Sequence, residues 1–501
     1  MITLTLAEIA AVVGGRLHDA GGDTAVTGSV EFDSRAIMPG GLFVAVPGER
    51  VDGHDFAAAA VARGAAAVLA AREVGTPAVI VPPVREAHRG ALALAGDSDG
   101  AGAAVLAALG KLARHVVDEL IPRGLAVVGV TGSSGKTSTK DLVAQLLAPM
   151  GPTVAPPGSF NNELGHPWTA LRCDEGTRYL VLELSARGPR HIAALCEVAP
   201  PSIGVVLNVG SAHVGEFGSR QNIATAKGEL AEALPAAADG GVAVLNADDP
   251  LVAAMAERTV ADVVLVGEAS WAGVRAVNVA LDDQARASFR LVTADGDHPV
   301  TLSLHGAHHV GNALSAAAVA LRLGATLPEV AGGLSGAVRI SGRRMDVSTR
   351  ADGLTVLNDA YNASPESVRA ALKTLATMSR ARASGRSWAV LGPMGELGDE
   401  STRVHDEIGR LAVRLDIDRL VVVGAQARAM HQGANQEGSW GEESVFVPDV
   451  QAAITLLRSE LRGEDVVLVK GANAYGMWRV AEDVLAPRDI RPEGHGAGDH
   501  A

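Results

Sequence analysis

The stretch that decides the fold is Val127-Val128-Gly129-Val130-Thr131-Gly132-Ser133-Ser134-Gly135-Lys136-Thr137-Ser138. In it a β-branched run enters a glycine-rich turn that ends in Gly-Lys-Thr, and a helical pattern follows through Leu147. Glycines let such a turn curl until its backbone N–H groups point inward, where those groups, a lysine and the helix N-terminus hold nucleotide phosphates. The stretch therefore predicts a domain that binds ATP or GTP, with the Thr137 hydroxyl on Mg²⁺.

One position departs from the usual spacing of this motif. The common pattern has a glycine five residues before the Gly of Gly-Lys, and this chain has Val130 there. A glycine-rich turn without that residue can be an ordinary strand-to-helix connection. Gly-Lys-Thr at the start of a helix nevertheless favours phosphate binding over that alternative.

The composition is typical of a globular α/β protein. At 501 residues the chain is long enough for about three domains with separate cores. Hydrophobic residues make up 48% but aromatic ones only 3%, so we expect cores of Ala, Val and Leu, and the 58 glycines follow no fixed repeat. A net charge of −14 disfavours nucleic-acid and anionic-membrane partners, because an acidic surface repels phosphate groups.

Cysteines and apolar stretches indicate the compartment. Cys173 and Cys196 are too few for a disulfide framework or a metal cage, which favours a reducing compartment. The first residues lack the basic and apolar segments of a signal peptide, and no apolar run reaches the roughly 18 residues that a membrane helix needs. We therefore expect a cytoplasmic protein without a transmembrane helix.

Strand and helix patterns divide the chain into three α/β domains and a tail. Residues 1–103 form the first domain, which ends in a stretch rich in Gly, Asp and Ser, and residues 104–340 form the central domain. Residues 341–486 form the third, whose pattern resembles a dinucleotide-binding, Rossmann-like fold without the Gly-x-Gly-x-x-Gly turn. Residues 487–501, rich in Gly, Asp and His, are expected to be disordered.

Strands are expected in all three domains. In the first domain they cover residues 26–32, 41–46, 65–70 and 78–81, with a helix at 56–63. In the central domain a helix at 105–120 precedes strands at 179–184, 202–208, 242–246 and 263–266 and a β-rich interval at 276–304. In the third domain they cover residues 354–358, 387–391, 419–423 and 466–469. Alternation of strands with helical segments is typical of mostly parallel sheets covered by helices.

Glu183 is the first candidate site residue outside the phosphate loop. It closes an apolar strand, and ligands of open α/β sheets bind beyond the carboxyl ends of the strands. Glu183 is therefore placed to meet the Mg²⁺ held by Thr137. The alternative is an ion pair with Arg187 or Arg190.

Other polar residues allow two interpretations each. His213 follows the strand at 202–208 and is a candidate ligand of a second metal ion, the alternative being a structural or surface histidine. Lys227 by itself is typical of a solvated helix lysine. Asp248 and Asp249 could form a carboxylate pair, but a helix cap formed by Asp is favoured. The polar loops at residues 159–167 and 358–365 are explained equally well by ligand binding and by turn chemistry.

Several motifs together resemble the Mur ligases, which are ATP-dependent amide-bond ligases of peptidoglycan precursor synthesis. They are Thr-Gly-Ser-Ser-Gly-Lys-Thr-Ser at 131–138, Phe-Asn-Asn-Glu-Leu-Gly at 160–165, Glu-Leu-Ser-Ala at 183–186, and the N-terminal segments 33–35, 43–45 and 47–56. The resemblance covers about residues 26–485. In that family the phosphate loop is built without the glycine that Val130 replaces.

The resemblance is strongest to the branch of the family that adds D-alanyl-D-alanine. Ser133-Ser134 stands where relatives that add the third stem-peptide residue usually carry Thr-Asn, and residues 359–365 and 391–398 also match this branch. It implies a UDP-binding N-terminal domain, a central P-loop ATPase-type sheet and a Rossmann-like acceptor-binding domain. It also implies ATP-dependent ligation of D-alanyl-D-alanine to UDP-N-acetylmuramoyl-tripeptide through an acyl phosphate, with release of ADP and phosphate. A monomer is expected.

The resemblance further implies a role for each matching residue. The expected ATP-binding residues are Gly132, Ser133, Ser134, Gly135, Lys136, Thr137, Ser138, Asn312, Arg344, Asp359 and Asn362, and Arg343 could compete with Arg344. Thr137 and Glu183 would hold one Mg²⁺ and His213 a second, while Lys227 would take up CO₂ as a carbamate that serves as a metal ligand. The expected catalytic residues are therefore Lys136, Glu183, His213 and Lys227. Ser34 and Arg35 would face the uridine, and Asn161, Asn162 and Ser185 the muramoyl substrate. His309 replaces the family's usual asparagine.

Two other functions stay open from the residues. One is a ligase of the same fold with a different acceptor, such as the enzyme that adds the third stem-peptide residue or a folylpolyglutamate synthase; the segment 33–35 argues against the folate enzyme. The other is a P-loop switch, which would hydrolyse or exchange nucleotide without an acceptor amine.

Overall fold

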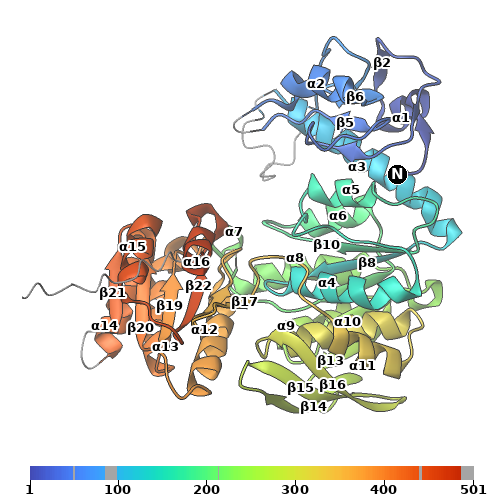
Figure 1. The fold of residues 1–501 in the computed structure, drawn as a ribbon. Coiled ribbons are helices and arrows are strands. Elements are labelled where there is room, and N and C mark those ends of the chain that lie inside the picture. Colours follow the sequence, from blue (N-terminus) through green and yellow to red (C-terminus); the bar gives the residue numbers. More distant parts are fainter. Residues whose placement is uncertain (49–50, 85–96, 98, 213, 439–442, 487–501) are drawn as a thin grey trace, which may run out of the picture. The chain divides into compact units, whose positions relative to one another are not determined.

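The computed structural model describes residues 1–48, 51–84, 97, 99–212, 214–438 and 443–486 (Figure 1). His213 and the tail at 487–501 therefore lie outside the described residues. The chain forms two compact units: Met1–Gly342 with Ser364–Ala370 and Gly395–Glu400, and Arg343–Ala363 with Ala371–Met394 and Ser401–Ala501. Each unit is described by itself.

The N-terminal part of the first unit is a small five-stranded sheet. Its order is β2 (Arg16–His18), β7 (Ala78–Ile80), β6 (Ala67–Ala70), β5 (Leu42–Val44) and β4 (Val30–Glu31), parallel except for β2. A separate two-stranded sheet pairs β1 (Leu4–Thr5) with β3 (Ala25–Val26), and the helices are α1 (Leu6–Val13) and α2 (Ala57–Ala62). α1 begins at a capping box between Thr5 and Glu8, which satisfies backbone N–H groups at its start.

The strand expected at residues 26–32 is divided between β3 and β4. Between them a Cβ on Gly28 would lie 2.7 Å from the carbonyl oxygen of Pro39 and 2.7 Å from the nitrogen of Gly41. Only a residue without a side chain lets the two backbone segments approach so closely. The chain therefore turns here from the two-stranded sheet into the larger one, and the expectation of one continuous strand was wrong.

A long helix, α3 (Ala101–Leu120), connects this sheet to the rest of the first unit. Val105, Leu109, Leu112 and Val116 recur at helical spacing and are fully buried. α3 packs against α1 on one side and against α5 (Gly165–Ala170) and α6 (His191–Val198) on the other. One continuous hydrophobic core consequently runs from the N-terminal sheet through α3 to the central sheet.

The central sheet has nine strands, and the phosphate loop follows β8 (Ala126–Thr131), the third strand from one edge. Its order is β16 (Gly296–His305), β15 (Arg286–Thr293), β14 (Val274–Leu281), β13 (Asp262–Gly267), β12 (Val242–Asn246), β11 (Ile203–Val206), β8 (Ala126–Thr131), β10 (Tyr179–Glu183) and β9 (Thr153–Val154). All neighbours from β14 to β9 are parallel, and β14, β15 and β16 pair antiparallel. This antiparallel extension is the β-rich interval that the sequence indicates.

Helices cover both faces of the central sheet. Val128 and Val130 of β8 pack toward α4 (Lys136–Leu147), α10 (His309–Arg322) and α11 (Leu327–Gly336). Val127, on the opposite face of the strand, packs toward α3, α6 and α8 (Arg220–Glu232). Burial on both faces explains the uninterrupted apolar run that precedes the phosphate loop.

The second unit contains a six-stranded sheet. Its order is β17 (Asp346–Thr349), β18 (Thr355–Asn358), β22 (Val466–Lys470), β19 (Ser387–Leu391), β20 (Arg419–Val423) and β21 (Ser444–Val447), parallel except for β17. The helices of this part of the chain are α12 (Pro365–Arg380), α13 (Ser401–Arg414), α14 (Arg428–Glu437), α15 (Val450–Glu460) and α16 (Trp478–Leu485). Trp388 and Val467 are fully buried in the core of the sheet.

The expected α/β class with a small N-terminal sheet, a central parallel sheet and a Rossmann-like third sheet is confirmed. Of the expected strands, those at 242–246, 387–391 and 419–423 coincide with β12, β19 and β20. Over the part of the chain that the structure describes, no helix is both long and apolar enough to cross a membrane.

Candidate active site

The phosphate loop lies between β8 and α4 and depends on a glycine at position 135. Gly135 has a φ of +85°, and a Cβ there would lie 2.6 Å from Oδ1 of Asn312. Both facts require glycine, because L side chains rarely adopt this backbone conformation. The loop is followed at once by α4, so its backbone N–H groups lie at the positive end of a helix.

Asn208 fixes the shape of the loop. Its Oδ1 accepts a hydrogen bond from the backbone N–H of Ser134 at 3.0 Å, and its Nδ2 donates to the Ser134 carbonyl at 3.1 Å. The carbonyl of Asn208 also accepts from the Ser133 N–H at 3.1 Å. The Lys136 ammonium donates to the Gly132 carbonyl at 2.8 Å. The sequence analysis missed Asn208, whose only signal is an asparagine directly after a buried strand.

Glu183 ends β10 beside the phosphate loop, since it pairs in register with Val130 of β8. Its side chain is fully buried, and its Oε2 accepts hydrogen bonds from Ser159 Oγ at 2.9 Å and Asn161 Nδ2 at 3.2 Å. Its Oε1 is buried with no hydrogen-bond partner among the described residues. The alternative of an ion pair with Arg187 or Arg190 is not found for this carboxylate in the described part of the chain.

An orphaned, buried carboxylate oxygen fits a cation. Within the described ranges, no group of three or more His, Cys, Asp and Glu side chains could hold a metal ion by itself. Mg²⁺ commonly takes only one or two carboxylates and completes its octahedron with nucleotide phosphates and water. Glu183 together with the Thr137 hydroxyl, which is 2% exposed, matches that requirement.

Lys227 lies on α8 and is buried, with 4% of its surface exposed. Burial, and to a lesser extent the neighbouring Lys136 ammonium, hold the pKa of Lys227 well below its ordinary value of 10.5. The interpretation as a solvated helix lysine was therefore wrong. What the structure provides here is a buried amine whose neutral form is favoured, close enough to Lys136 of the phosphate loop for the two charges to interact.

The polar loop at 159–162 is held on the end of β10. Ser185 Oγ donates to the Asn161 carbonyl at 2.9 Å, and the Ser185 N–H donates to the same carbonyl at 3.1 Å. Asn162 Oδ1 accepts from the Gly165 N–H at 2.9 Å and thereby starts α5. Hydrogen bonds thus join Asn161 to Glu183 and to Ser185, and Asn162 follows in the same loop.

In the N-terminal sheet, Asp33, Ser34 and Arg35 form a tight turn after β4. Arg35 Nε and Nη2 donate to the Asp33 carboxylate at 2.9 and 2.7 Å, and the Arg35 N–H donates to Asp33 Oδ1 at 2.9 Å. These hydrogen bonds from Arg35 lower the pKa of Asp33 to about 2. Ser34 is half-buried and the Arg35 side chain is 82% exposed, so both are accessible to a ligand.

Asn312 lies on α10 and faces the phosphate loop, as its approach to Gly135 shows. Its Nδ2 lies 3.4 Å from Nδ1 of His309, one turn earlier. Burial lowers the pKa of His309 well below its ordinary 6.5, with smaller contributions from His308 and His305. A neutral His309 can accept at Nδ1 and so orient the Asn312 amide.

The second unit carries the remaining predicted residues. Arg343 pairs with Glu482 at 3.2 Å, whereas the Arg344 guanidinium stacks 4.1 Å from the Tyr361 ring centroid and makes no ion pair with a described residue. The Asp359 carboxylate pairs with the buried Lys470 ammonium at 2.5 Å and accepts from the Met345 N–H at 3.0 Å. Asn362 accepts from Lys470 through its carbonyl at 2.9 Å. Asp359 and Asn362 therefore hold their loop in place through contacts with Lys470. The Arg344 guanidinium, which has no carboxylate partner among the described residues, can still bind an anion.

The alternative of a carboxylate pair at Asp248 and Asp249 is not favoured by the hydrogen bonds. Asp249 caps α9 (Pro250–Ala253) by accepting from the Leu251 N–H at 3.0 Å, as expected. Asp248 accepts from the N–H groups of Glu268 and Ala269 at 2.8 and 2.9 Å. Both carboxylates thus bind backbone.

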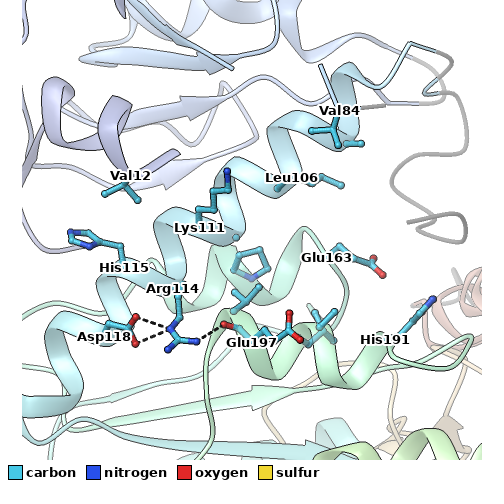
Figure 2. A pocket seen from close by; sticks show the side chains of 17 residues that line it. Val12, Val84, Leu106, Lys111, Arg114, His115, Asp118, Glu163, His191 and Glu197 are labelled. Carbon is cyan, nitrogen blue, oxygen red and sulfur yellow. Dashed lines mark hydrogen bonds and ion pairs between the residues drawn. The ribbon is translucent and has the colours of Figure 1, made fainter. Parts of the chain in front are cut away.

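A cavity of about 690 Å³ lies along α3 and α6, apart from the predicted residues (Figure 2). Across it Arg114 donates to Asp118 at 2.7 Å and to the Glu197 carbonyl at 3.0 Å. The apolar part of its lining includes Leu106, Gly110, Pro167 and Leu195. Its described lining includes Glu163 and Pro167 of the polar loop at 159–167 but none of the residues predicted individually as site residues.

Comparison with known proteins identifies the architecture. Residues 28–115 match a model described as Mur ligase family, catalytic domain; residues 130–320 match the Mur ligase middle domain; residues 343–473 match the Mur ligase, glutamate ligase domain. Together these segments span most of the chain.

Two curated relatives bear the same name, UDP-N-acetylmuramoyl-tripeptide–D-alanyl-D-alanine ligase. The protein from Mycobacterium tuberculosis (strain ATCC 25618 / H37Rv) is 56% identical over 97% of this chain and 98% of its own length. The protein from Escherichia coli (strain K12) is 34% identical over 96% and 98%.

Solved structures agree in fold over nearly the whole chain. A crystal structure of MurF from Acinetobacter baumannii superposes with a TM-score of 0.81 at 29% identity, covering 96% of this chain and 99% of that one. The structure of MurF ligase from Thermotoga maritima in complex with ADP gives a TM-score of 0.73 at 29% identity, covering 91% and 97%.

Proposed function

Because this chain belongs to the Mur ligase family, we propose that it joins D-alanyl-D-alanine to UDP-N-acetylmuramoyl-tripeptide, with conversion of ATP to ADP and phosphate. The observation that carries the proposal is the phosphate loop braced by Asn208 next to the orphaned carboxylate oxygen of Glu183. Relatives of that name match over almost the full length of the chain. The product is the pentapeptide precursor of peptidoglycan.

ATP is bound by the loop at residues 132–138, whose N–H groups and Lys136 contact the phosphates. Asn312 reaches the adenine from α10, and Arg344 is proposed as a further, positively charged ATP-binding residue. Asp359 and Asn362 hold the region around Arg344 in shape through Lys470. Arg343 is a weaker candidate than Arg344 because it is already paired with Glu482.

Mg²⁺ is the second expected cofactor. Thr137 and Glu183 would hold it, and the ion would neutralise charge on the phosphates that otherwise repels an incoming carboxylate. His213 as a ligand of a second Mg²⁺ stays a prediction.

The substrate lies across two segments of the first unit. Ser34 and Arg35 contact the uridine end, and Asn161, Asn162 and Ser185 the muramoyl end. The terminal carboxylate of the tripeptide attacks the γ-phosphorus of ATP, which gives an acyl phosphate and ADP. The amine of D-alanyl-D-alanine then attacks the acyl carbon and displaces phosphate. The chain itself mainly positions the reactants and screens their charges.

Lys227 is proposed to carry a carbamate. A neutral lysine amine adds to CO₂ with formation of an N–C bond and release of one proton, which turns the neutral side chain into an anionic carbamate that can serve as a metal ligand. The lowered pKa of Lys227 supplies the neutral amine that this addition needs. Burial beside Lys136 would then favour the anion, since opposite charges attract strongly away from water.

We also propose that the protein acts in the cytoplasm. Cys173 and Cys196 are free, buried thiols, as expected in a reducing compartment. The three α/β domains expected at 1–103, 104–340 and 341–486 are likewise proposed as the functional divisions of the chain.

Phosphate release tests the proposed reaction. The enzyme is incubated with ATP, Mg²⁺ and UDP-N-acetylmuramoyl-tripeptide, with and without D-alanyl-D-alanine. A ligase releases phosphate steadily only when both co-substrates are present, because the acyl phosphate needs the amine to turn over. Equal release in both conditions would indicate a simple nucleotide hydrolase and would contradict the proposal.

Replacing Lys227 tests the carbamate. Lys227→Ala is expected to lower kcat by about 10- to 100-fold or more, the loss typical of removing a group that supports a metal site. Added acetate or formate should restore part of the activity by occupying the space of the carbamate. Lys373→Ala, which removes an exposed lysine, is the matched control. Full activity of Lys227→Ala would refute the assignment.

A further inference from the structure

Three aromatic side chains, Phe32, Phe160 and Trp168, form a cluster in the first unit. The Trp168 ring centroid lies 5.5 Å from that of Phe32 and 4.8 Å from that of Phe160, and the two phenyl centroids are 6.3 Å apart. These are the separations at which aromatic pairs attract each other beyond their burial. The chain has only 7 Phe, 5 Trp and 3 Tyr, so three of them in one place is a substantial share.

The cluster joins two segments that are distant in sequence. Phe32 directly precedes Asp33-Ser34-Arg35, and Phe160 directly precedes Asn161-Asn162. Trp168, which is 9% exposed, belongs to α5, and that helix is tied to the second segment because Asn162 accepts from the N–H groups of Gly165 and His166 at 2.9 Å each. The helix that carries Trp168 is therefore anchored at its start to Asn162.

Trp168 is also hydrogen-bonded to the strand that precedes the first segment. Its Nε1 donates to the Val30 carbonyl at 2.9 Å and to Glu31 Oε2 at 3.2 Å. Val30 is 2% exposed, so its carbonyl has little access to water as a substitute partner. Partial burial raises the pKa of Glu31, whereas the hydrogen bond from Trp168 lowers it. On the other side, the Arg172 guanidinium lies 5.2 Å from the Trp168 ring centroid.

We propose that Trp168 is a positioning residue that fixes the separation between residues 33–35 and residues 161–162. The inference rests on the proposed function, in which one UDP-linked substrate contacts both segments. Such a substrate binds well only if the two segments are already at the right distance, because ordering them on binding would cost free energy. ATP is bound by a different loop, at residues 132–138, and the second segment reaches the proposed Mg²⁺ site only through hydrogen bonds such as that from Asn161 to Glu183. The affinity for ATP should therefore depend on this separation much less than the affinity for the UDP-linked substrate does.

A tryptophan that only fills space would behave differently. The packing role of Trp168 depends on the volume of its ring, whereas a positioning role also depends on the hydrogen bond from its Nε1–H to the Val30 carbonyl of β4. Trp168→Phe keeps an aromatic ring and removes the donor, and Trp168→Leu removes both. Trp388→Phe is a matched control in the other unit, because Trp388 Nε1 also donates to a carboxylate, Asp465 Oδ2, at 3.0 Å.

The experiment measures KM for each of the three substrates and kcat in these variants. Trp168→Phe should raise KM for UDP-N-acetylmuramoyl-tripeptide roughly fivefold, the change that corresponds to losing one buried hydrogen bond. Trp168→Leu should raise it more than about tenfold, as the ring contacts are lost as well. In both variants KM for ATP and kcat should stay within about twofold of the wild-type values, well short of a tenfold change. The control should leave KM for the UDP-linked substrate unchanged.

Unchanged KM for the UDP-linked substrate in both Trp168 variants would overturn the inference, and so would an equal rise in KM for ATP. Ser34→Ala and Arg35→Ala separate this result from a failure of the proposed site. If neither raises KM for the UDP-linked substrate, the proposed uridine contact is wrong and the inference fails with it. If both raise it and the Trp168 variants do not, the uridine contact stands and only the positioning role fails.

Discussion

Two ionisable residues, Lys227 and Glu183, are buried in the folded protein, with exposed fractions of 4% and 0%. An isolated buried charge is so costly that it is kept only where it is neutralised or meets a counter-charge. The residues around Lys227, Ala224-Thr225-Ala226-Lys227-Gly228, do not reveal this, because burial of a helix residue is decided by what packs across from it. Glu183 could be predicted, since it closes an apolar strand whose end faces the ligand side of the sheet.

His309 is expected to make the protein less stable in acid. Burial lowers the pKa of His309 in the folded state. As the pH falls through the ordinary value of 6.5, the His309 imidazole therefore stays neutral in the folded protein, whereas it binds a proton in the unfolded chain. The free energy of unfolding is therefore fully present above that value and falls as pH decreases below it, by up to about 1.4 kcal/mol per pH unit. His309→Asn should show a shallower loss between pH 6.5 and pH 5 in urea unfolding.

The comparison is made against a second histidine variant. The control is His298→Gln, because His298 lies on strand β16 and is partly exposed. We expect it to keep the wild-type pH dependence of the unfolding midpoint. Identical slopes for wild type and His309→Asn would contradict the role assigned to the buried imidazole.

At the scale of elements, helix α4 follows the phosphate loop and also holds the segment at residues 338–341. Gln145 Oε1 accepts from the Val338 N–H and its Nε2 donates to the Val338 carbonyl, both at 2.9 Å. Asp141 Oδ2 accepts from the Ser341 N–H at 3.1 Å. The side chains of Val338 and Ile340 are 59% and 55% exposed, so these polar contacts from α4, and not apolar burial, hold the segment that ends at the unit boundary at Gly342.

Gln145→Ala should loosen that segment. It removes two hydrogen bonds worth about 1 kcal/mol each, so amide hydrogen exchange in the peptide that covers residues 338–341 should become roughly thirtyfold faster. Gln451→Ala, on the exposed face of α15, is the control and should leave this peptide unchanged. An unchanged exchange rate in Gln145→Ala would show that other contacts hold the segment.

Elements with strong patterns were predictable and short ones were not. β19 and β20 each contain four consecutive apolar residues after a polar first residue, Ser387 or Arg419, and both were predicted with their observed limits. β1, β2, β17 and β21 have two to four residues each, too few for a period of two to stand out, and the sequence analysis did not find them. α1 also escaped it, although Thr5 and Glu8 have the spacing of a capping box.

At the scale of the whole molecule, the chemistry of the site was more predictable than its support. Lys136, Thr137 and Glu183 lie at the ends of strands in a pattern that the sequence displays. Asn208 and Trp168 act through contacts with residues 74 and 138 positions away in the chain, and one sequence contains no record of such pairings. What could not be predicted is therefore the set of long-range contacts that hold the functional segments in place.

The uneven burial of the tryptophans gives the molecule an optical property. Trp168 and Trp388 are 9% and 0% exposed, whereas Trp271 is 57% exposed. An aqueous collisional quencher such as iodide reaches an exposed indole and not a buried one, so of these three it quenches Trp271 before the other two. The emission of Trp168 and Trp388 survives, and the first of these comes from the junction between residues 33–35 and 161–162. The difference in surviving emission between wild type and Trp168→Phe thus reports on that junction without any attached dye.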